Sequence, residues 1–192
     1  MASYQVTVAP TSEPLTRAEA KAYLRVDGTD EDTLIDSLIV SAREFVETEI
    51  WRPLMSQTIV YWMDFDDITT GVFNINKAPI QSITSVQYYD SSNNLQTLSA
   101  TNYEYDLFSN PCRFKLINVP SCYDKMNTMK ITFVAGYSSA ANVPSKIKQA
   151  MYLLIGSWFE NRQEEVTGTQ VSQFEMTARA LLYSYRNNLL LC

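Results

Sequence analysis

The residue types that carry most enzyme chemistry are scarce in this chain. Histidine is absent from the 192 residues, and three cysteines, Cys112, Cys122 and Cys192, have spacings that match no metal-binding motif. Serine and cysteine nucleophiles usually need a neighbouring base, most often histidine. A zinc site would need four thiolate or carboxylate ligands, which these scattered thiols do not supply. We therefore predict no catalytic, cofactor-binding or metal-binding residues.

Carboxylates are the remaining chemistry-bearing side chains, and two groups of them are close in sequence. Asp64, Asp66 and Asp67 lack the spacing and the glycine of a calcium loop. Glu164 and Glu165 form the second group. A glycosidase-type enzyme, one open alternative, would need two acids facing each other across a cleft. Solvated turns are the simpler interpretation of both groups.

The composition is that of a globular protein. Hydrophobic residues make up 46% of the chain, and 192 residues suffice for one domain, or for one domain with a subdomain. The longest apolar run is too short to span a bilayer. The N-terminal residues MASYQVTVAP lack the basic and apolar regions of a secretory signal. We therefore expect synthesis in a cytoplasm and no association with membranes.

The net charge of −6 is distributed unevenly. Residues 1–52 contain ten acids and five bases and carry −5, the middle carries −2, and the segment from Pro144 carries +1. Binding to nucleic acid needs clustered lysine and arginine, so an acidic chain is a poor candidate for it. The acidic surface is either simply solvated or one past which DNA slides without sticking.

Apolar residues recur at helical spacing near both ends of the chain. Thr16 and Glu19 form a capping-box pattern that starts a short helix to about Arg25, with Ala18 and Ala22 facing inward. A second helix is predicted from Thr29 or Asp30 to Pro53, a third after Pro144, and a last one from about Thr177, following a polar segment at 163–173. The apolar stripe of the second helix is Leu34, Ile35, Leu38, Ile39, Ala42, Phe45, Val46 and Ile50.

The middle of the chain predicts short strands. Runs rich in β-branched and aromatic residues lie at 57–63, 71–75, 83–89, 95–98, 103–106, 113–116 and 130–134. The predicted fold class is therefore α+β: a mainly helical body with an inserted antiparallel sheet or barrel. The expected domains are an N-terminal helical arm at 1–54, a β-rich insert at 55–142, and C-terminal helices and tail at 143–192 that form one helical body with the arm.

Motifs along nearly the whole chain resemble a known family. The N-terminal ones are Leu15-Thr16-x-x-Glu19-Ala20-Lys21, Asp32-x-Leu34-Ile35-x-x-Leu38-Ile39-x-x-Ala42-Arg43 and Arg52-Pro53-Leu54-x-x-Gln57-Thr58. The later ones are Pro79-Ile80-x-Ser82-Ile83-x-Ser85-Val86, Phe133-x-Ala135-Gly136-Tyr137, Val143-Pro144-x-x-Ile147-Lys148, Trp158-Phe159-Glu160-Asn161-Arg162 and Leu181-Leu182-x-x-Tyr185-Arg186. In this order they resemble the head–tail connector (adaptor, head-completion) proteins of tailed bacteriophages.

The resemblance implies a structural virion protein located in the neck, at the head–tail interface, without enzymatic activity or cofactors. It implies a ring, usually of twelve subunits, between the portal protein and the stopper or tail-completion protein. Packaged DNA would pass through the lumen without sequence-specific binding. Two positions depart from the family, which commonly has prolines where this chain has Phe174-Glu175-Met176-Thr177 and Ser184.

The same resemblance suggests two sets of functional residues. The C-terminal segment of relatives reaches the portal, which implies partner binding by Leu181, Leu182, Tyr185, Arg186, Leu189, Leu190 and Leu191. The acidic flank of the second helix is expected to face the lumen or a neighbouring subunit through Glu44, Glu47 and Glu49. One alternative function stays open: a virion-associated module that binds glycan or peptide through the aromatic β part.

Overall fold

The structure, a computed structural model, describes residues 3–68, 71–161 and 170–187, with the backbone alone for 170–174. The chain forms two compact units. The β unit contains residues 1–10 and 56–138, and the helical unit contains residues 11–55 and 139–192. Each unit therefore combines segments that are far apart in the sequence.

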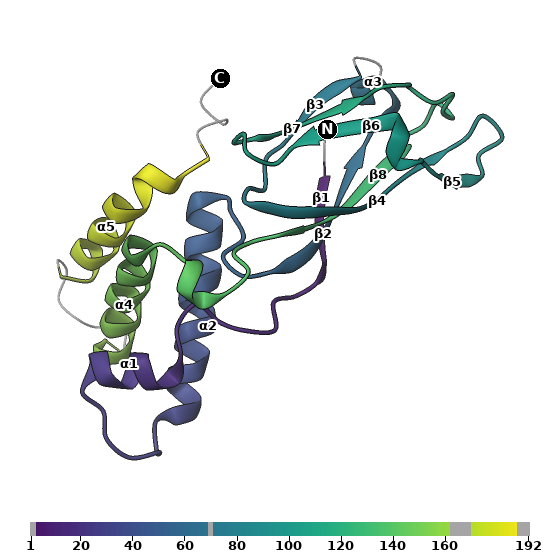
Figure 1. Ribbon diagram of the computed structural model, residues 1–192. Coiled ribbons are helices and arrows are strands. Elements are labelled where there is room, and N and C mark those ends of the chain that lie inside the picture. Colours follow the sequence, from purple (N-terminus) through teal and green to yellow (C-terminus); the bar gives the residue numbers. More distant parts are fainter. Residues whose placement is uncertain (1–2, 69–70, 162–169, 188–192) are drawn as a thin grey trace. The chain divides into compact units, whose positions relative to one another are not determined.

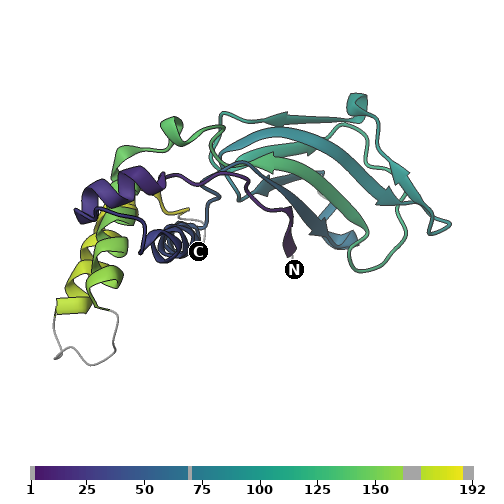
Figure 2. The ribbon, with the colours of Figure 1, turned by 90° about the horizontal axis from the view of Figure 1, so that it is seen from below.

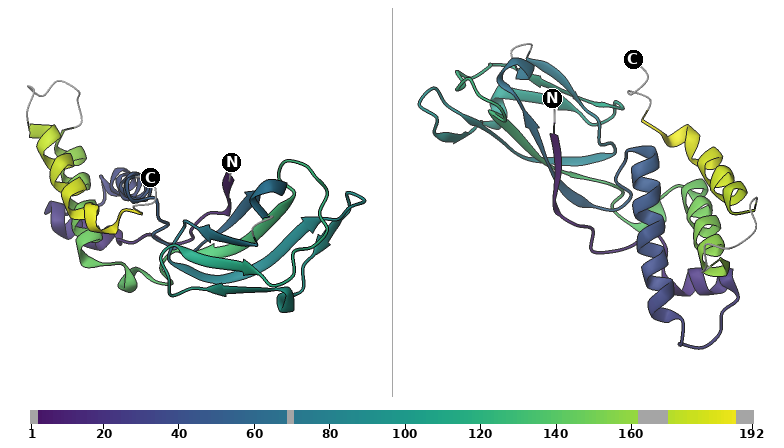
Figure 3. Two further views of the ribbon diagram at one scale, coloured as in Figure 1. Left: turned by 90° about the horizontal axis from the view of Figure 1, so that it is seen from above. Right: turned by 180° about the vertical axis from the view of Figure 1, so that it is seen from behind.

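The helical unit is built from α1 (Arg17–Leu24), α2 (Asp32–Ile50), α4 (Ser145–Glu160) and α5 (Gln170–Leu182). Single 3₁₀ turns lie at Ala140–Asn142 and Tyr183–Tyr185. Helix α4 packs against both α2 and α5, and α1 lies across one end of α4 (Figures 1 and 3). The apolar stripes of these helices meet in one core.

Local sequence explains where the first two helices begin and what they bury. The predicted capping box is present: the Thr16 hydroxyl accepts from the Glu19 backbone N–H at 3.2 Å, and the Glu19 carboxylate accepts from the Thr16 N–H at 2.7 Å. In α1 the buried residue is Ala20, between the predicted Ala18 and Ala22. Helix α2 buries Ile35, Ile39, Ala42, Arg43, Val46 and Ile50.

The β unit contains two antiparallel sheets that pack face to face (Figure 2). The five-stranded sheet has the order β1-β2-β8-β4-β5, and the three-stranded sheet has the order β3-β7-β6. The strands are β1 (Ser3–Val8), β2 (Gln57–Met63), β3 (Val72–Ile75), β4 (Ile80–Tyr89), β5 (Leu95–Thr97), β6 (Tyr103–Asp106), β7 (Cys112–Leu116) and β8 (Met129–Ala135). A single turn of helix, α3 (Phe65–Ile68), precedes β3.

Aromatic rings fill the space between the two sheets. Phe114 is fully buried and stacks on Phe73 and Tyr103, with ring centroids 4.9 and 5.2 Å apart. Tyr61 stacks on Tyr4 at 4.7 Å, which attaches the edge strand β1 to β2. Burial raises the pKa values of both tyrosines. Most of these aromatic rings therefore contact one another inside the sandwich.

Several features differ from the sequence-based expectations. The α+β class with antiparallel strands is confirmed, but the described strands form two open sheets, so a barrel is not confirmed. Nor is a mainly helical molecule, because the β unit is as substantial as the helical one. Strand β1 is not predicted by the sequence analysis, which leaves Ser3–Val8 inside the helical arm. Helix α5 begins at Gln170, within the segment expected to be a loop.

Candidate functional site

The C-terminal end of the described chain lies against the C-terminal end of α2. Ala178 and Leu182 on α5 are fully buried in the helical core. Leu181 and Tyr185 are half-buried, and Tyr183 is 66% exposed. Leu182 therefore stabilises this subunit's own core.

Arg186 attaches this segment to α2. Its Nε donates to the Glu49 carbonyl oxygen at 3.1 Å, and its Nη2 lies 3.0 Å from the Glu49 carboxylate. The backbone N–H of Asn187 donates to the Ile50 carbonyl oxygen at 3.1 Å. The last carbonyl groups of a helix have no partner within the helix, and cations there interact favourably with the helix dipole. Arg186 thus holds the last described residues against α2, and Leu189, Leu190 and Leu191 lie outside the described residues.

The three glutamates of the expected acidic face have different surroundings. Glu44 is exposed and lies 3.4 Å from Arg43. The Glu47 carboxylate accepts from the Leu54 backbone N–H at 2.7 Å and from Arg43 at 2.9 Å. The Glu49 carboxylate contacts Arg186 and also Arg179, at 3.5 Å. Only Glu44 therefore offers a well-exposed carboxylate, and the other two take part in contacts within the subunit.

Sequence reasoning does not predict the buried position of Arg43. Its side chain is 9% exposed, and its nitrogen atoms lie 2.8 Å from Glu13 and 2.9 Å from Glu47. Burial raises the pKa values of Glu13 and Glu47, although the positive charge of Arg43 acts in the opposite direction. One feature of the sequence points to this burial. Arg43 lies on the edge of the apolar stripe of α2, and an acid follows four residues later.

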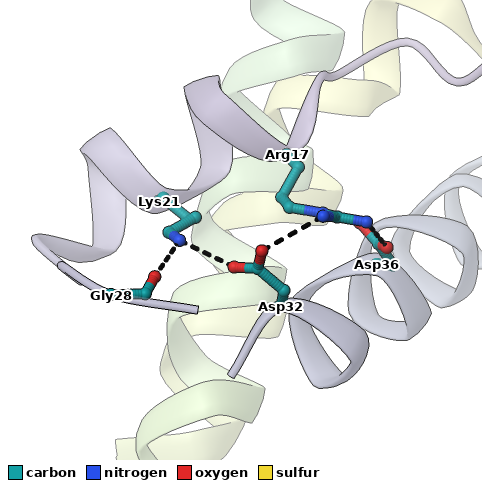
Figure 4. A network of polar contacts seen from close by, with 5 residues as sticks. All are labelled: Arg17, Lys21, Gly28, Asp32 and Asp36. Atoms are coloured by element: carbon teal, nitrogen blue, oxygen red, sulfur yellow. Dashed lines mark hydrogen bonds and ion pairs between the residues drawn. The ribbon is translucent and has the colours of Figure 1, made fainter. Parts of the chain in front are cut away.

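A second ionic network joins α1 to the start of α2 (Figure 4). Arg17 bonds Asp36 through Nε at 2.8 Å and approaches Asp32 at 3.1 Å, while Lys21 reaches Asp32 at 2.6 Å and bonds the Gly28 carbonyl oxygen. Hydrogen bonds from Lys21 and Arg17 lower the pKa values of Asp32 and Asp36. Such carboxylates stabilise the fold above their unfolded pKa values and lose that effect as pH falls.

The comparisons with known proteins cover most of the chain. The sequence model of the family described as "Head completion protein" matches residues 13–188. The chain belongs to this family. The match includes Arg43, Glu49 and Arg186, and it stops just before the leucines at 189–191. Head completion is a structural role rather than an enzyme class.

Solved structures share the fold of this head completion protein. One is the neck of an empty gene transfer agent (GTA) particle computed with C6 symmetry: TM-score 0.73, 19% identity, covering 96% of this chain and 95% of the other. Another is the neck of a native GTA particle computed with C12 symmetry: TM-score 0.72, 19% identity, covering 97% and 94%. A third is a virion of a native GTA particle, with TM-score 0.76, 18% identity and coverage of 95% and 94%. No curated protein sequence matches the chain.

The described residues of the Asp64–Asp67 group and the Cys112 thiol have surroundings that fit a structural role, and Glu164 and Glu165 lie outside the described residues. The Asp64 carboxylate accepts from the Asn127 backbone N–H at 2.8 Å, which lowers its pKa, and Asp66 and Asp67 lie in the first turn of α3. Burial raises the pKa of the Cys112 thiol to about 11. Within the described ranges, no three His, Cys, Asp or Glu side chains are grouped closely enough to hold a metal ion. Nor does any described helix have the length and apolar character needed to cross a membrane.

Proposed function

We propose that this head completion protein is a structural component of a virion neck. Copies of the chain form a ring, of twelve as the family resemblance implies, between the portal and the stopper or tail-completion protein. The observation that carries this proposal is the match of the fold, over 96% of the chain, to a chain in a GTA neck structure. The family match over residues 13–188 supports the proposal from the sequence alone.

A closed ring needs two different complementary faces on each subunit, because its interface is heterologous. The two compact units offer candidates for such faces. We propose that they act as domains with boundaries near residues 54 and 143, with residues 1–10 added to the β domain and the helical unit supplying the portal side.

In the proposed ring, packaged DNA passes through the lumen without binding tightly to its wall. The chain carries a net charge of −6, and the exposed Glu44 side chain would add negative charge to a surface facing the axis. Negative surfaces repel the phosphate backbone, whereas tight binding needs clusters of Lys and Arg. Of the three predicted acids, Glu44 therefore fits the lumen role best, since its side chain is 65% exposed, whereas those of Glu47 and Glu49 are 17% and 18% exposed.

The portal-docking segment is proposed to begin at Asn187. Contacts from Arg186 and Asn187 to the last residues of α2 hold the start of the segment at a defined place. Leu189, Leu190 and Leu191 follow directly. Burial of these three leucines on docking would favour binding through the hydrophobic effect. The cost of ordering the segment reduces that contribution.

Deletion of residues 188–192 should leave the fold intact and weaken docking to purified portal about 100-fold, because the burial of three leucines is lost. Binding is measured by titrating portal with labelled subunit. Replacing Leu189, Leu190 and Leu191 together by serine should have the same effect, whereas Cys192→Ser should bind normally. Undiminished decoration of portals by the truncated protein would show that the tail does not dock there.

The alternative of a glycan- or peptide-binding module gains no support from the aromatic rings that lie between the two sheets. Tyr4, Tyr61, Phe73, Phe114 and Tyr103 stack on one another between the two sheets. A ligand-binding groove would need such rings along its walls. We therefore retain the neck protein as the proposed function.

A further inference from the structure

The outer face of the three-stranded sheet is hollowed. The cavity has a volume of about 330 Å³ and is lined by Val72 on β3, by the aromatic residues Tyr105 and Phe114, and by four charged residues, Glu104, Asp106, Arg113 and Lys115. A cavity of about 150 Å³ is enough to hold benzene. The hollow can therefore accept the phenyl ring of a phenylalanine.

A fully exposed phenylalanine lies in the turn that joins two of the strands lining this hollow. Phe108, in the turn between β6 and β7, is 102% exposed, so its ring contacts nothing in its own subunit. Its neighbour Leu107 packs instead against the core of the sandwich. The turn thus directs one apolar side chain inward and presents the next one to the solvent.

The turn that presents Phe108 is hydrogen-bonded to residues in the walls of the hollow. The Asp106 carboxylate accepts from the backbone N–H groups of Phe108 at 2.9 Å and Ser109 at 3.3 Å. The Ser109 hydroxyl donates to the Asp106 carbonyl oxygen at 3.2 Å and accepts from the Arg113 N–H at 3.2 Å. Arg113 pairs with Asp106 at 2.7 Å. A side chain presented on an ordered turn loses less entropy on binding than one on a flexible loop.

The charges around the hollow balance one another. Asp106 pairs with Arg113, and Glu104 pairs with Lys115 at 2.9 Å, both across strands β6 and β7. This face is therefore neutral, although the whole chain carries −6. Two copies of an acidic protein repel each other least where their contacting surfaces are neutral.

We propose that two copies of this chain pair through the outer face of the three-stranded sheet by a two-fold contact. Phe108 of each copy enters the hollow of the other. A projection and a complementary hollow side by side on one surface are the arrangement that a self-complementary, two-fold interface requires. This contact differs from the heterologous contact of a ring and does not depend on the proposed function.

Sedimentation equilibrium of the full chain tests the proposal. A small interface of this kind should give concentration-dependent pairs between about 1 µM and about 1 mM. Phe108→Ala should weaken pairing about 30-fold, as expected for an interface hot spot. Met126→Ala is the matched control, because Met126 is 82% exposed and is not among the residues that line the hollow, and it should leave pairing unchanged.

A mixing experiment tests the two-fold geometry itself. Val72→Arg places a long, charged side chain in the hollow at a residue that is 53% exposed, and it should weaken pairing at least as much as Phe108→Ala does. A mixture of the two variants should form mixed pairs, because one intact hollow then meets one intact phenylalanine. Native mass spectrometry distinguishes these mixed pairs by mass.

Three outcomes would overturn the proposal: a wild-type chain that stays monomeric or self-associates only as larger rings, pairing that is as tight in Phe108→Ala as in the wild type, or two variants that fail to pair when mixed. Circular dichroism of each variant checks that the fold is retained, and a variant that unfolds is replaced by Phe108→Ser or Val72→Lys. Retention of pairing in the replacement would likewise contradict the proposal.

Discussion

Replacing Arg43 by methionine is expected to lower the free energy of unfolding of the helical unit by about 3 kcal/mol at pH 7. The Arg43 side chain is 9% exposed and donates hydrogen bonds to both Glu13 and Glu47. Methionine has a similar length but leaves two partly buried carboxylates without their counter-charge. Hydrogen exchange of the backbone amides of α2 and α4 would measure the loss.

The loss of stability caused by Arg43→Met should depend on pH. Burial raises the pKa values of Glu13 and Glu47 above 4.5 in the folded protein, and removing Arg43 raises them further. A carboxyl with a raised folded pKa binds protons more tightly when folded, so stability falls as pH rises from the unfolded pKa through the folded one. The difference between Arg43→Met and wild type should therefore be largest at pH 7 and shrink toward pH 4.5.

Arg17→Met provides the control for the Arg43 experiment. Arg17 also bonds two carboxylates, but its side chain is 48% exposed. Water screens such pairs, and their contribution is small. A loss for Arg43→Met no larger than for Arg17→Met, or one that is independent of pH, would contradict this account of the cluster.

Replacing Phe114 by alanine should destabilise the β unit by about 4 kcal/mol, through lost burial and the cavity that remains. Phe114 is fully buried and stacks on Phe73 and Tyr103. Phe108→Ala, a few residues away, is the matched control and should change stability little, because its ring is fully exposed. Chemical denaturation followed by far-ultraviolet circular dichroism measures both.

Phe114→Ala and Arg43→Met together test whether the two units unfold independently. Phe114→Ala should first reduce amide protection in β2, β7 and β8, and Arg43→Met in α2 and α4, since each acts on one compact unit. Equal loss of protection in both units for either variant would show that they unfold as one.

Local patterns predict the helices and most strands well. Strands β2 (Gln57–Met63) and β6 (Tyr103–Asp106) have the predicted bounds, because β-branched and aromatic residues in short runs suit a half-buried, pleated surface. Helix α2 follows its apolar stripe and ends before Pro53. These features depend on neighbours within a few residues.

Features that depend on distant neighbours are not predictable in this way. Strand β8 lies between β2 and β4, a pairing across more than 40 residues that no local run specifies. The burial of Arg43 depends on Glu13, 30 residues earlier. Strand β1 has the β-branched and aromatic residues of a strand, but its place in the sheet depends on pairing with β2, at least 50 residues later, and on the stacking of Tyr4 on Tyr61.

The most direct test of the proposed function is electron microscopy of the purified full-length protein mixed with purified portal. The proposal predicts a closed ring of this chain, of twelve subunits when bound, seated on one end of the portal around an open channel. Portal particles that carry no ring, or that bind single copies at scattered positions, would contradict it.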